Sequence, residues 1–399
     1  MRPFDGRRVL LVVSGGIAAY KAAFLARRLV EAGAGVDVII TRGAERFIGS
    51  VTFEGITGRP VHTDLWERPM AHLELGRAAD AVVVAPATAD LIARLAAGAA
   101  DGLATATLLA CDRPVIVCPA MNTRMWEHPA TVRNVDTLRG FGHELVGPDD
   151  GPLAEGESGP GRMAETAEIL ARLGRILEPD SGLGGLKVVV TAGPTRAPID
   201  PVRFLSNRSS GRMGHALAAA AWRRGADVLL ISGPGHASRP PGPRVIDVET
   251  ASEMLAALET GLRDARILLM AAAVGDFEAV AVEKHKIKKG GEGRLDLTLE
   301  AAPDLLVETR ALRERNGIFT LGFALETENA LENGRAKLEG KGLELIAVNL
   351  AGEPDSGFDV DTNRVTLLDA AGDTEALPLL TKDELADRLL DRIEESLKT

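Results

Sequence analysis

The sequence has few cysteines and no long apolar segment. Its two cysteines, Cys111 and Cys118, both flank or lie in an apolar run, which favours buried thiols in a reducing cytosol over a disulfide framework. No segment reaches the roughly 18 uninterrupted apolar residues of a membrane helix, and the first apolar run, 9–13, is too short for a signal peptide. The net charge of -11 argues against nucleic-acid binding, which needs a basic surface. We therefore expect a soluble, cytoplasmic protein that binds neither nucleic acid nor membrane.

The length of 399 residues favours two domains, because one hydrophobic core rarely exceeds roughly 250–300 residues. Apolar runs without polar alternation are separated by helical patterns, which predicts parallel sheets covered on both faces. This alternation stops before the linker-like stretch EPDSGLGG and restarts at 186–191. We predict an α/β protein with two doubly wound, mostly parallel sheets, a first domain at 1–178, a linker at 179–185 and a second domain at 186–399.

Three loops follow predicted strands in the first half of the chain. They read SGGIAAYK (14–21), APATADLIAR (85–94) and PAMNTRMW (119–126). In an open parallel sheet, ligands bind beyond the carboxyl ends of the strands. The first loop pairs two glycines with the start of a helix, whose backbone amides can hold a phosphate. Taken alone, this loop is more typical of a plain strand-to-helix turn.

Taken together, the three loops resemble the homo-oligomeric flavin-containing cysteine decarboxylases over about residues 6–177. Within that family they are most similar to the phosphopantothenoylcysteine decarboxylases, whose signature is PAMN (119–122) followed by Met125. The resemblance implies a flavodoxin-like domain that binds FMN and acts on 4'-phosphopantothenoylcysteine. It also implies FMN contacts from Ser14, Gly15, Gly16, Thr41, Thr88 and Thr105.

The same resemblance assigns roles to two further residues. His72 falls where the family has its catalytic histidine, and its ordinary pKa of about 6.5 suits proton movement near the substrate thiol. Asn122 would hold the departing carboxylate through its amide donors. Without the surrounding motifs, His72 would be interpreted as a solvated histidine at a helix start.

One position departs from this family. Its flap contains a cysteine that donates the last proton, whereas segment 154–163 here reads AEGESGPGRM with Glu155 in that place. We expect Glu155 to donate instead, provided that burial and neighbouring Glu157 raise its pKa. Ser158 and Cys118 are alternative donors. In a further alternative, the decarboxylase is impaired and the first domain is a flavin-binding oligomerisation scaffold beside an active ligase.

In the second half, residues 191–214 read TAGPTRAPIDPVRFLSNRSSGRMG and enter an alanine-rich helix. Small residues and glycines before a helix are typical of a phosphate-binding loop, although neither the dinucleotide fingerprint nor the P-loop pattern is present. The stretch closely resembles the phosphopantothenate–cysteine ligases. Further matches, which extend over residues 186–399, are AAAVGDF (271–277), KIKK (286–289), APDLL (302–306), GFALET (322–327) and AVN (347–349).

The ligase resemblance implies a Rossmann-like domain that uses CTP to activate 4'-phosphopantothenate and then joins it to cysteine. Lys286 would assist acyl-cytidylate formation, although a basic run by itself is usually a solvated loop, and Asn207 would act when cysteine attacks. Asp276 would contact the nucleotide or Mg2+. Lys337 and Lys341 lie four residues apart, so they share one helix face and can face one phosphate group. The remaining substrate-binding residues implied are Ala273, Pro303, Asp304, Leu305, Leu306 and Phe323.

The resemblance to both families also implies a homo-oligomer with trimers of the first domain and dimers of the second. A regulatory flavoprotein that catalyses nothing is the least favoured interpretation, because the ligase motifs would then have no purpose.

Overall fold

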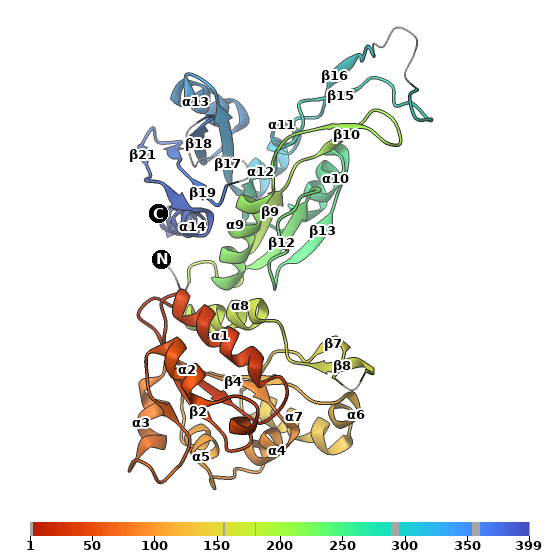
Figure 1. Ribbon diagram of the computed structural model, residues 1–399. Coiled ribbons are helices and arrows are strands. Elements are labelled where there is room, and N and C mark those ends of the chain that lie inside the picture. The colour runs from red at the N-terminus through yellow and green to blue at the C-terminus, as the bar shows by residue number, and fades with distance from the viewer. Residues whose placement is uncertain (1–2, 155, 180, 289–294, 353–359, 399) are drawn as a thin grey trace. The chain divides into compact units, whose positions relative to one another are not determined.

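The computed structural model describes residues 3–154, 156–179, 181–288, 295–352 and 360–398 (Figure 1). The chain divides into two compact units, Met1–Pro179 and Asp180–Thr399. Each unit places helices around a mostly parallel sheet, which confirms the predicted α/β class. No helix in the described part of the chain is long and apolar enough to cross a membrane.

The first unit contains a six-stranded parallel sheet in the order β3-β2-β1-β4-β5-β6. With the two-residue β3 set aside, the remaining strands have the order 2-1-3-4-5 of a flavodoxin-like sheet. The strands are β1 (Arg8–Val13), β2 (Gly35–Ile40), β3 (Val61–His62), β4 (Ala81–Ala87), β5 (Val115–Pro119) and β6 (Glu144–Leu145).

Helices cover both faces of this sheet because its central strands are apolar on both sides. Alternate residues of β1, such as Leu11 and Leu10, belong to two separate apolar clusters. One cluster includes residues of α1 (Ala19–Glu31), α2 (Ser50–Thr57) and α8 (Thr166–Leu177). The other includes α3 (Ala71–Ala78), α4 (Ala89–Ala96), α5 (Leu103–Leu109) and α7 (Pro129–Gly140). A short helix, α6 (Thr123–Trp126), precedes α7.

The glycine- and proline-rich segment before α8 forms an antiparallel hairpin of β7 (Asp149–Pro152) and β8 (Ser158–Arg162). The sequence predicts only a long loop here, because its composition lacks the β-branched and aromatic residues of ordinary strands. The hairpin instead satisfies its backbone groups by pairing. Glu155 lies outside the described residues.

The second unit contains an eight-stranded sheet in the order β13-β12-β9-β14-β17-β18-β20-β21. Its first six strands are parallel and have the order 3-2-1-4-5-6, which is the Rossmann arrangement. They are β9 (Lys187–Ala192), β12 (Asp227–Ser232), β13 (Arg244–Asp247), β14 (Ile267–Met270), β17 (Phe319–Glu326) and β18 (Leu345–Leu350). The last two, β20 (Thr366–Asp369) and β21 (Thr374–Ala376), are antiparallel.

The helices of this unit are α9 (Arg212–Arg223), α10 (Ala251–Gly261), α11 (Leu305–Glu308), α12 (Arg310–Asn316), α13 (Ala330–Lys341) and α14 (Lys382–Lys398). Among the described residues of this unit, three small antiparallel pairs lie outside the main sheet. They are β10 (Arg196–Pro198) with β11 (Phe204–Ser206), β15 (Phe277–Ala279) with β16 (Leu299–Ala301), and β19 (Thr362–Asn363) with β22 (Leu380–Thr381). The first two pairs interrupt the loops that follow β9 and β14, at the carboxyl end of the sheet.

Candidate functional sites

A cavity of about 1370 Å3 lies at the carboxyl end of the sheet in the first unit. This is where the strand order reverses between β1 and β4, the usual ligand site of an open α/β sheet. The three loops predicted from the sequence all border it, and so does the β7–β8 hairpin. The lining residues come from segments 14–21, 39–43, 63–66, 88–94, 101–105, 120–125, 152–154 and 161–163.

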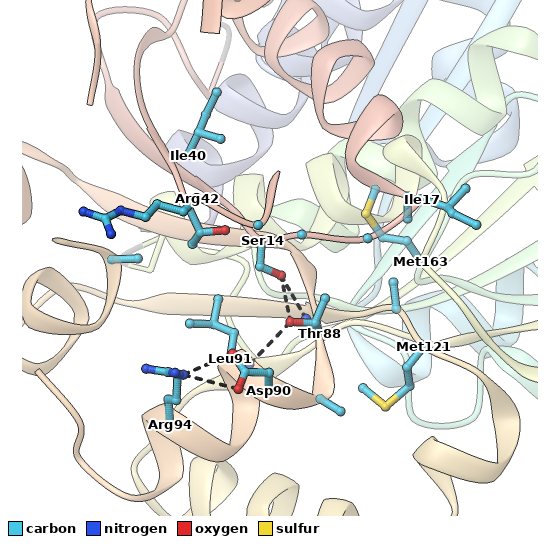
Figure 2. A pocket seen from close by; sticks show the side chains of 18 of the residues that line it. Ser14, Ile17, Ile40, Arg42, Thr88, Asp90, Leu91, Arg94, Met121 and Met163 are labelled. Atoms are coloured by element: carbon cyan, nitrogen blue, oxygen red, sulfur yellow. Dashed lines mark hydrogen bonds and ion pairs between the residues drawn. The ribbon is translucent and has the colours of Figure 1, made fainter. Parts of the chain in front are cut away.

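Ser14 and Thr88 join the ends of β1 and β4 beneath the cavity (Figure 2). The Ser14 hydroxyl donates to the carbonyl oxygen of Pro86 at 2.7 Å, and the Thr88 N–H donates to Ser14 Oγ at 3.0 Å. Thr88 also caps α4 by accepting from the Leu91 N–H at 3.4 Å. Ser14 is only 2% exposed, so its role in the structure is to fix the two loops together.

Gly15 and Gly16 form the turn that leads into α1. A Cβ atom on Gly15 would lie 2.5 Å from the carbonyl carbon of Gly43, closer than real side chains approach backbone. A Cβ on Gly16 would meet Thr88 at 3.5 Å, an ordinary contact. The helix N-cap, Ala18, supplies no side-chain cap. No side-chain oxygen therefore caps the start of this helix, as in helix starts that bind phosphate through backbone amides.

Thr41 and Thr105 line the same cavity and cap local turns. Thr41 Oγ1 accepts from the Ala44 N–H at 3.3 Å. Thr105 Oγ1 donates to the Gly102 carbonyl at 3.0 Å and accepts from the Gly102 N–H at 3.2 Å. Their hydroxyls thus stabilise the loops that shape the wall.

Asn122 and Met125 also line the cavity. Asn122 Oδ1 accepts from the Arg124 N–H at 2.8 Å and caps α6, while Met125 is half exposed. Asn122 also carries an amide NH2 group, a type of donor that can bind an anion. Both predicted residues border the cavity.

The hairpin is fastened to this PAMN loop. The Met121 N–H donates to the Gly161 carbonyl at 3.0 Å, and a Cβ on Gly161 would lie 2.2 Å from the Met121 oxygen. Arg124 forms an ion pair with Glu157 at 3.1 Å. Glu157, which the sequence places as a neighbour of Glu155, is therefore paired with an arginine.

His72 and Cys118 are not among the residues that line this cavity. His72 lies half-buried in the first turn of α3. Cys118 is fully buried in the apolar core, and burial raises the pKa of its thiol well above the ordinary range. A thiol so placed is a poor proton donor to a cavity ligand, which weakens Cys118 as an alternative to Glu155.

The site also contains charged residues that the sequence reasoning did not select. Arg42 forms an ion pair with Asp64 at 3.0 Å, and Arg94 pairs with Asp90 at 3.1 Å and with Asp101 at 2.6 Å. The hydrogen bond from Arg94 lowers the pKa of Asp101. The rule that ligands bind beyond strand ends could have selected both arginines, because Arg42 is the second residue after β2 and Arg94 lies in the APATADLIAR segment.

A second candidate site lies in the second unit, at the carboxyl ends of β9 and β14. The loops after these strands are joined by backbone contacts. The Ala273 N–H donates to the Gly193 carbonyl at 2.9 Å, and the Thr195 N–H donates to the Ala273 carbonyl at 3.2 Å. Thr195 Oγ1 in turn accepts from the Gly275 N–H at 2.9 Å. The two loops consequently form one wall at the point where the strand order reverses.

The start of α9 packs backbone to backbone against this wall. Gly193 has a φ of +77°, and a Cβ there would lie 2.7 Å from the Gly233 oxygen. Gly211, the α9 N-cap, has a φ of +81° and provides no side-chain cap. Glycine is required at both positions by conformation and by space. No N-cap side chain covers this helix start, as in a loop that binds phosphate through backbone amides.

Asn207 is bound to this wall, and Asp276 belongs to one of its two loops. Asn207 Nδ2 donates to the carbonyls of Ala273 at 3.0 Å and Val274 at 3.3 Å. Asp276 is exposed, and its carbonyl accepts from the Ala302 N–H at 2.9 Å. The structure thus brings the SNR, AAAVGDF and APDLL motifs together.

Asp304 of the APDLL turn forms an ion pair with Lys341, one of the two predicted lysines. Asp304 Oδ1 caps α11 by accepting from the N–H groups of Leu306 at 3.1 Å and Val307 at 3.3 Å. Asp304 Oδ2 lies 3.0 Å from Lys341 Nζ. Burial opposes ionisation of Asp304, but Lys341 and the two amides lower its pKa. Pro303 and Leu305 belong to the same turn.

Lys337 is bound to a different carboxylate. Its ammonium lies 2.6 Å from Glu326 Oε1 at the end of β17, and Asn333 donates to Glu326 Oε2 at 3.0 Å. Phe323 lies on the same strand. The two lysines share α13 as predicted, yet each is paired with a carboxylate from a different motif.

Lys286 is exposed, and its segment is anchored through the neighbouring residue. The Ile287 N–H donates to Asp200 Oδ2 at 3.1 Å, and the Ile287 carbonyl accepts from Arg203 at 3.1 Å. Although burial opposes ionisation of Asp200, the N–H groups of Val202 and Ile287 hold its pKa at about 2. The KIKK motif ends at Lys289, outside the described residues.

Asp276 is the predicted metal ligand. Across the residues that the structure describes, no group of three or more His, Cys, Asp or Glu side chains could hold a metal ion. A Mg2+ ion at Asp276 would therefore need most of its ligands from a bound nucleotide and water, as is usual for this ion.

Comparisons with known proteins agree with the two units. Residues 2–177 match the Flavoprotein family model, and residues 183–397 match the model of the DNA/pantothenate metabolism flavoprotein C-terminal domain. The coenzyme A biosynthesis bifunctional protein CoaBC of Mycolicibacterium smegmatis is 44% identical, with 98% of each chain covered. That of Vibrio cholerae is 43% identical, with 100% of each chain covered.

Among solved structures, the crystal structure of the C-terminal domain of a CoaBC protein is 34% identical. It covers 55% of this chain and 99% of its own, with a TM-score of 0.47. The full-length relatives and the two matching family models show that the chain belongs to the family of coenzyme A biosynthesis bifunctional proteins, enzymes that combine a decarboxylase with a ligase.

Proposed function

We propose that the first unit binds FMN in its cavity and decarboxylates 4'-phosphopantothenoylcysteine. The observation that carries this proposal is the junction of Ser14, Gly15 and Thr88 beside the uncapped start of α1. It offers backbone amides to a phosphate at the mouth of a cavity large enough for a flavin and a substrate. Family membership supports the same activity.

Bound FMN would supply the oxidising step by taking a hydride from the cysteine moiety of the substrate. Asn122 would donate its amide N–H groups to the substrate carboxylate, and Met125 would contact the substrate beside it. His72 would act on the substrate thiol in a cavity of a neighbouring subunit, since it does not line the cavity of its own chain. Glu155 would return the last proton from the hairpin.

The second unit would join cysteine to 4'-phosphopantothenate with CTP and Mg2+. Support comes from the wall that holds Asn207 and Ala273 beside the phosphate-type start of α9. Lys286 would stabilise charge on the α-phosphate, and Asp276 would contact the nucleotide or its Mg2+. Lys337 and Lys341 would exchange their carboxylate partners for nucleotide oxygens.

Exposed apolar side chains support an oligomer. Ile17 before α1 and Tyr20 and Phe24 in its first two turns are each more than half exposed, which fits a trimer contact of the first unit. Phe277 and Val280 at the β15–β16 hairpin are also more than half exposed, which fits a dimer contact of the second unit. We place this homo-oligomer in the cytoplasm.

Separate assays of CO2 release and pyrophosphate release test the two halves. Purified chain with bound FMN should release CO2 from 4'-phosphopantothenoylcysteine and, independently, pyrophosphate from CTP with cysteine and 4'-phosphopantothenate. Pyrophosphate release without CO2 release would favour the alternative of an active ligase beside a flavin-binding scaffold. Equal rates with ATP and CTP would contradict the nucleotide assignment.

A further inference from the structure

Arg313 on α12 is among the largest fully buried side chains of the protein. It is 2% exposed. Its Nη1 donates to Thr320 Oγ1 at 3.1 Å and to the Gly342 carbonyl at 2.8 Å, and its Nη2 donates to the carbonyls of Leu306 at 2.8 Å and Lys341 at 2.7 Å. All four hydrogens on its terminal nitrogens are therefore directed to oxygen atoms of three separate segments.

Two of these bonds complete the end of α13. The last carbonyls of a helix have no partner within it, and a cationic donor there also interacts favourably with the helix dipole. Arg313 donates to the carbonyls of Lys341 and Gly342, while Arg310 donates to the carbonyl of Gly340 at 3.0 Å. The final turn of α13, which presents Lys341, is thereby held in place.

A third bond reaches the APDLL turn through Leu306. The APDLL turn and the end of α13 are also joined by the 3.0 Å ion pair between Asp304 and Lys341. A guanidinium is a rigid planar fork, so its two nitrogens fix the spacing of the two segments they bind. The positions of Asp304 and Lys341 relative to one another consequently depend on Arg313.

Burial of the charged Arg313 side chain at this position is energetically unfavourable. Its Nε is buried without a hydrogen-bond partner among the described residues, and burial lowers the pKa of the guanidinium despite the nearby charge of Glu344. Replacing buried charge with apolar side chains of similar volume is often neutral or stabilising. An apolar side chain of similar volume could fill this space, but it could not bind the carbonyl groups of both segments.

We propose that Arg313 is a positioning residue of the ligase, which sets the α13 terminus against the APDLL turn so that Lys341 meets nucleotide phosphate at a fixed place. This inference rests on the proposed nucleotide role of Lys341 and goes beyond it, because Arg313 itself is buried and touches no ligand. Its effect is exerted through Lys341.

The test is steady-state ligase kinetics of the full-length chain with Arg313→Met, Lys341→Ala and the double variant. Arg313→Met should raise the KM for CTP about tenfold, the equivalent of one lost hydrogen bond to a charged group, with the KM for cysteine unchanged. Because Arg313 acts through Lys341, the double variant should bind CTP no more weakly than Lys341→Ala alone, within about twofold. Arg315→Met removes an exposed arginine from the same helix and should behave as wild type.

An unchanged KM for CTP in Arg313→Met would overturn the proposal. So would a double variant whose rise in the KM for CTP equals the product of the rises in the two single variants. If Arg313→Met does not fold, Arg313→Lys replaces it. This variant keeps the charge but not the fork, so it should fold with a raised KM, and a wild-type KM would refute the inference. The nucleotide that the wild-type chain accepts is used throughout, so failure of CTP would contradict the proposed function while leaving the Arg313 measurement decisive.

Discussion

Replacing Gly15 with alanine should weaken the binding of FMN while leaving the rest of the first unit folded. The added Cβ would lie 2.5, 2.7 and 2.8 Å from the carbonyl carbon, oxygen and Cα of Gly43. All three are backbone atoms, so no side-chain rotation can relieve the contact, and the turn before α1 must move. That turn presents the amides proposed to hold the FMN phosphate.

The size of the effect follows from the cost of inserting a methyl group into packed structure. Such insertions typically cost about 1–3 kcal/mol, which corresponds to a rise of about 5- to 150-fold in the Kd for FMN if the displacement is concentrated in the turn. The assay is titration of FMN into flavin-free protein, followed by flavin fluorescence. The ratio of bound FMN to protein after purification gives a second readout.

Gly43→Ala is the matched control because it adds a methyl group to the other side of the same contact. Gly43 has a φ of −68°, and its Cβ would lie 3.5 Å from Gly15 Cα, an ordinary contact. It should bind FMN nearly as wild type does. Equal affinities for Gly15→Ala and wild type, or equal losses in both variants, would refute the steric argument.

Three other predictions concern the remaining chemistry. Lys286→Ala should block formation of the acyl-cytidylate, whereas Asn207→Ala should let it accumulate, as mass spectrometry of quenched reactions would show; identical behaviour would contradict the division of roles. Glu155→Gln should still release CO2 in the first turnover but accumulate the enethiol with reduced flavin, and unchanged turnover to 4'-phosphopantetheine would exclude Glu155 as the donor. Burial lowers the pKa of His215. The unfolded chain therefore binds more protons than the folded chain as the pH falls below about 7. The free energy of unfolding should decrease in that range, with a slope against pH of at most one bound proton. Thermal unfolding of His215→Gln should show a flatter pH dependence, and an unchanged profile would contradict this assignment.

The fold was largely predictable because its strands are apolar on both faces. Runs such as 9–13 and 115–118 predict buried parallel strands, and β1 and β5 occupy almost the same residues. The β7–β8 hairpin was not predictable in this way, because its residues pair through the backbone and carry no periodic pattern. The antiparallel β20 and β21 likewise depend on pairing with the edge of a sheet that only the tertiary fold creates.

The sites were predictable to the extent that motifs follow strands. Ser14, Thr88 and Asn122 border one cavity because parallel strands end at the same edge of the sheet. His72 does not line the cavity of its own chain. It was predicted only from the resemblance to the decarboxylase family. Arg313 gave no sequence signal, since its role depends on carbonyl groups of segments that come together only in the folded chain. Residues that act by positioning others are the ones that sequence patterns miss.

The claim that one chain carries out both reactions is tested most directly in a single reaction. The purified chain, with FMN bound, receives 4'-phosphopantothenate, cysteine, CTP and Mg2+. Mass spectrometry should show 4'-phosphopantothenoylcysteine as a transient and 4'-phosphopantetheine as the final product, with one CMP formed per product molecule. Accumulation of 4'-phosphopantothenoylcysteine without further conversion would contradict the decarboxylase activity. The absence of any CTP-dependent product would contradict the ligase activity.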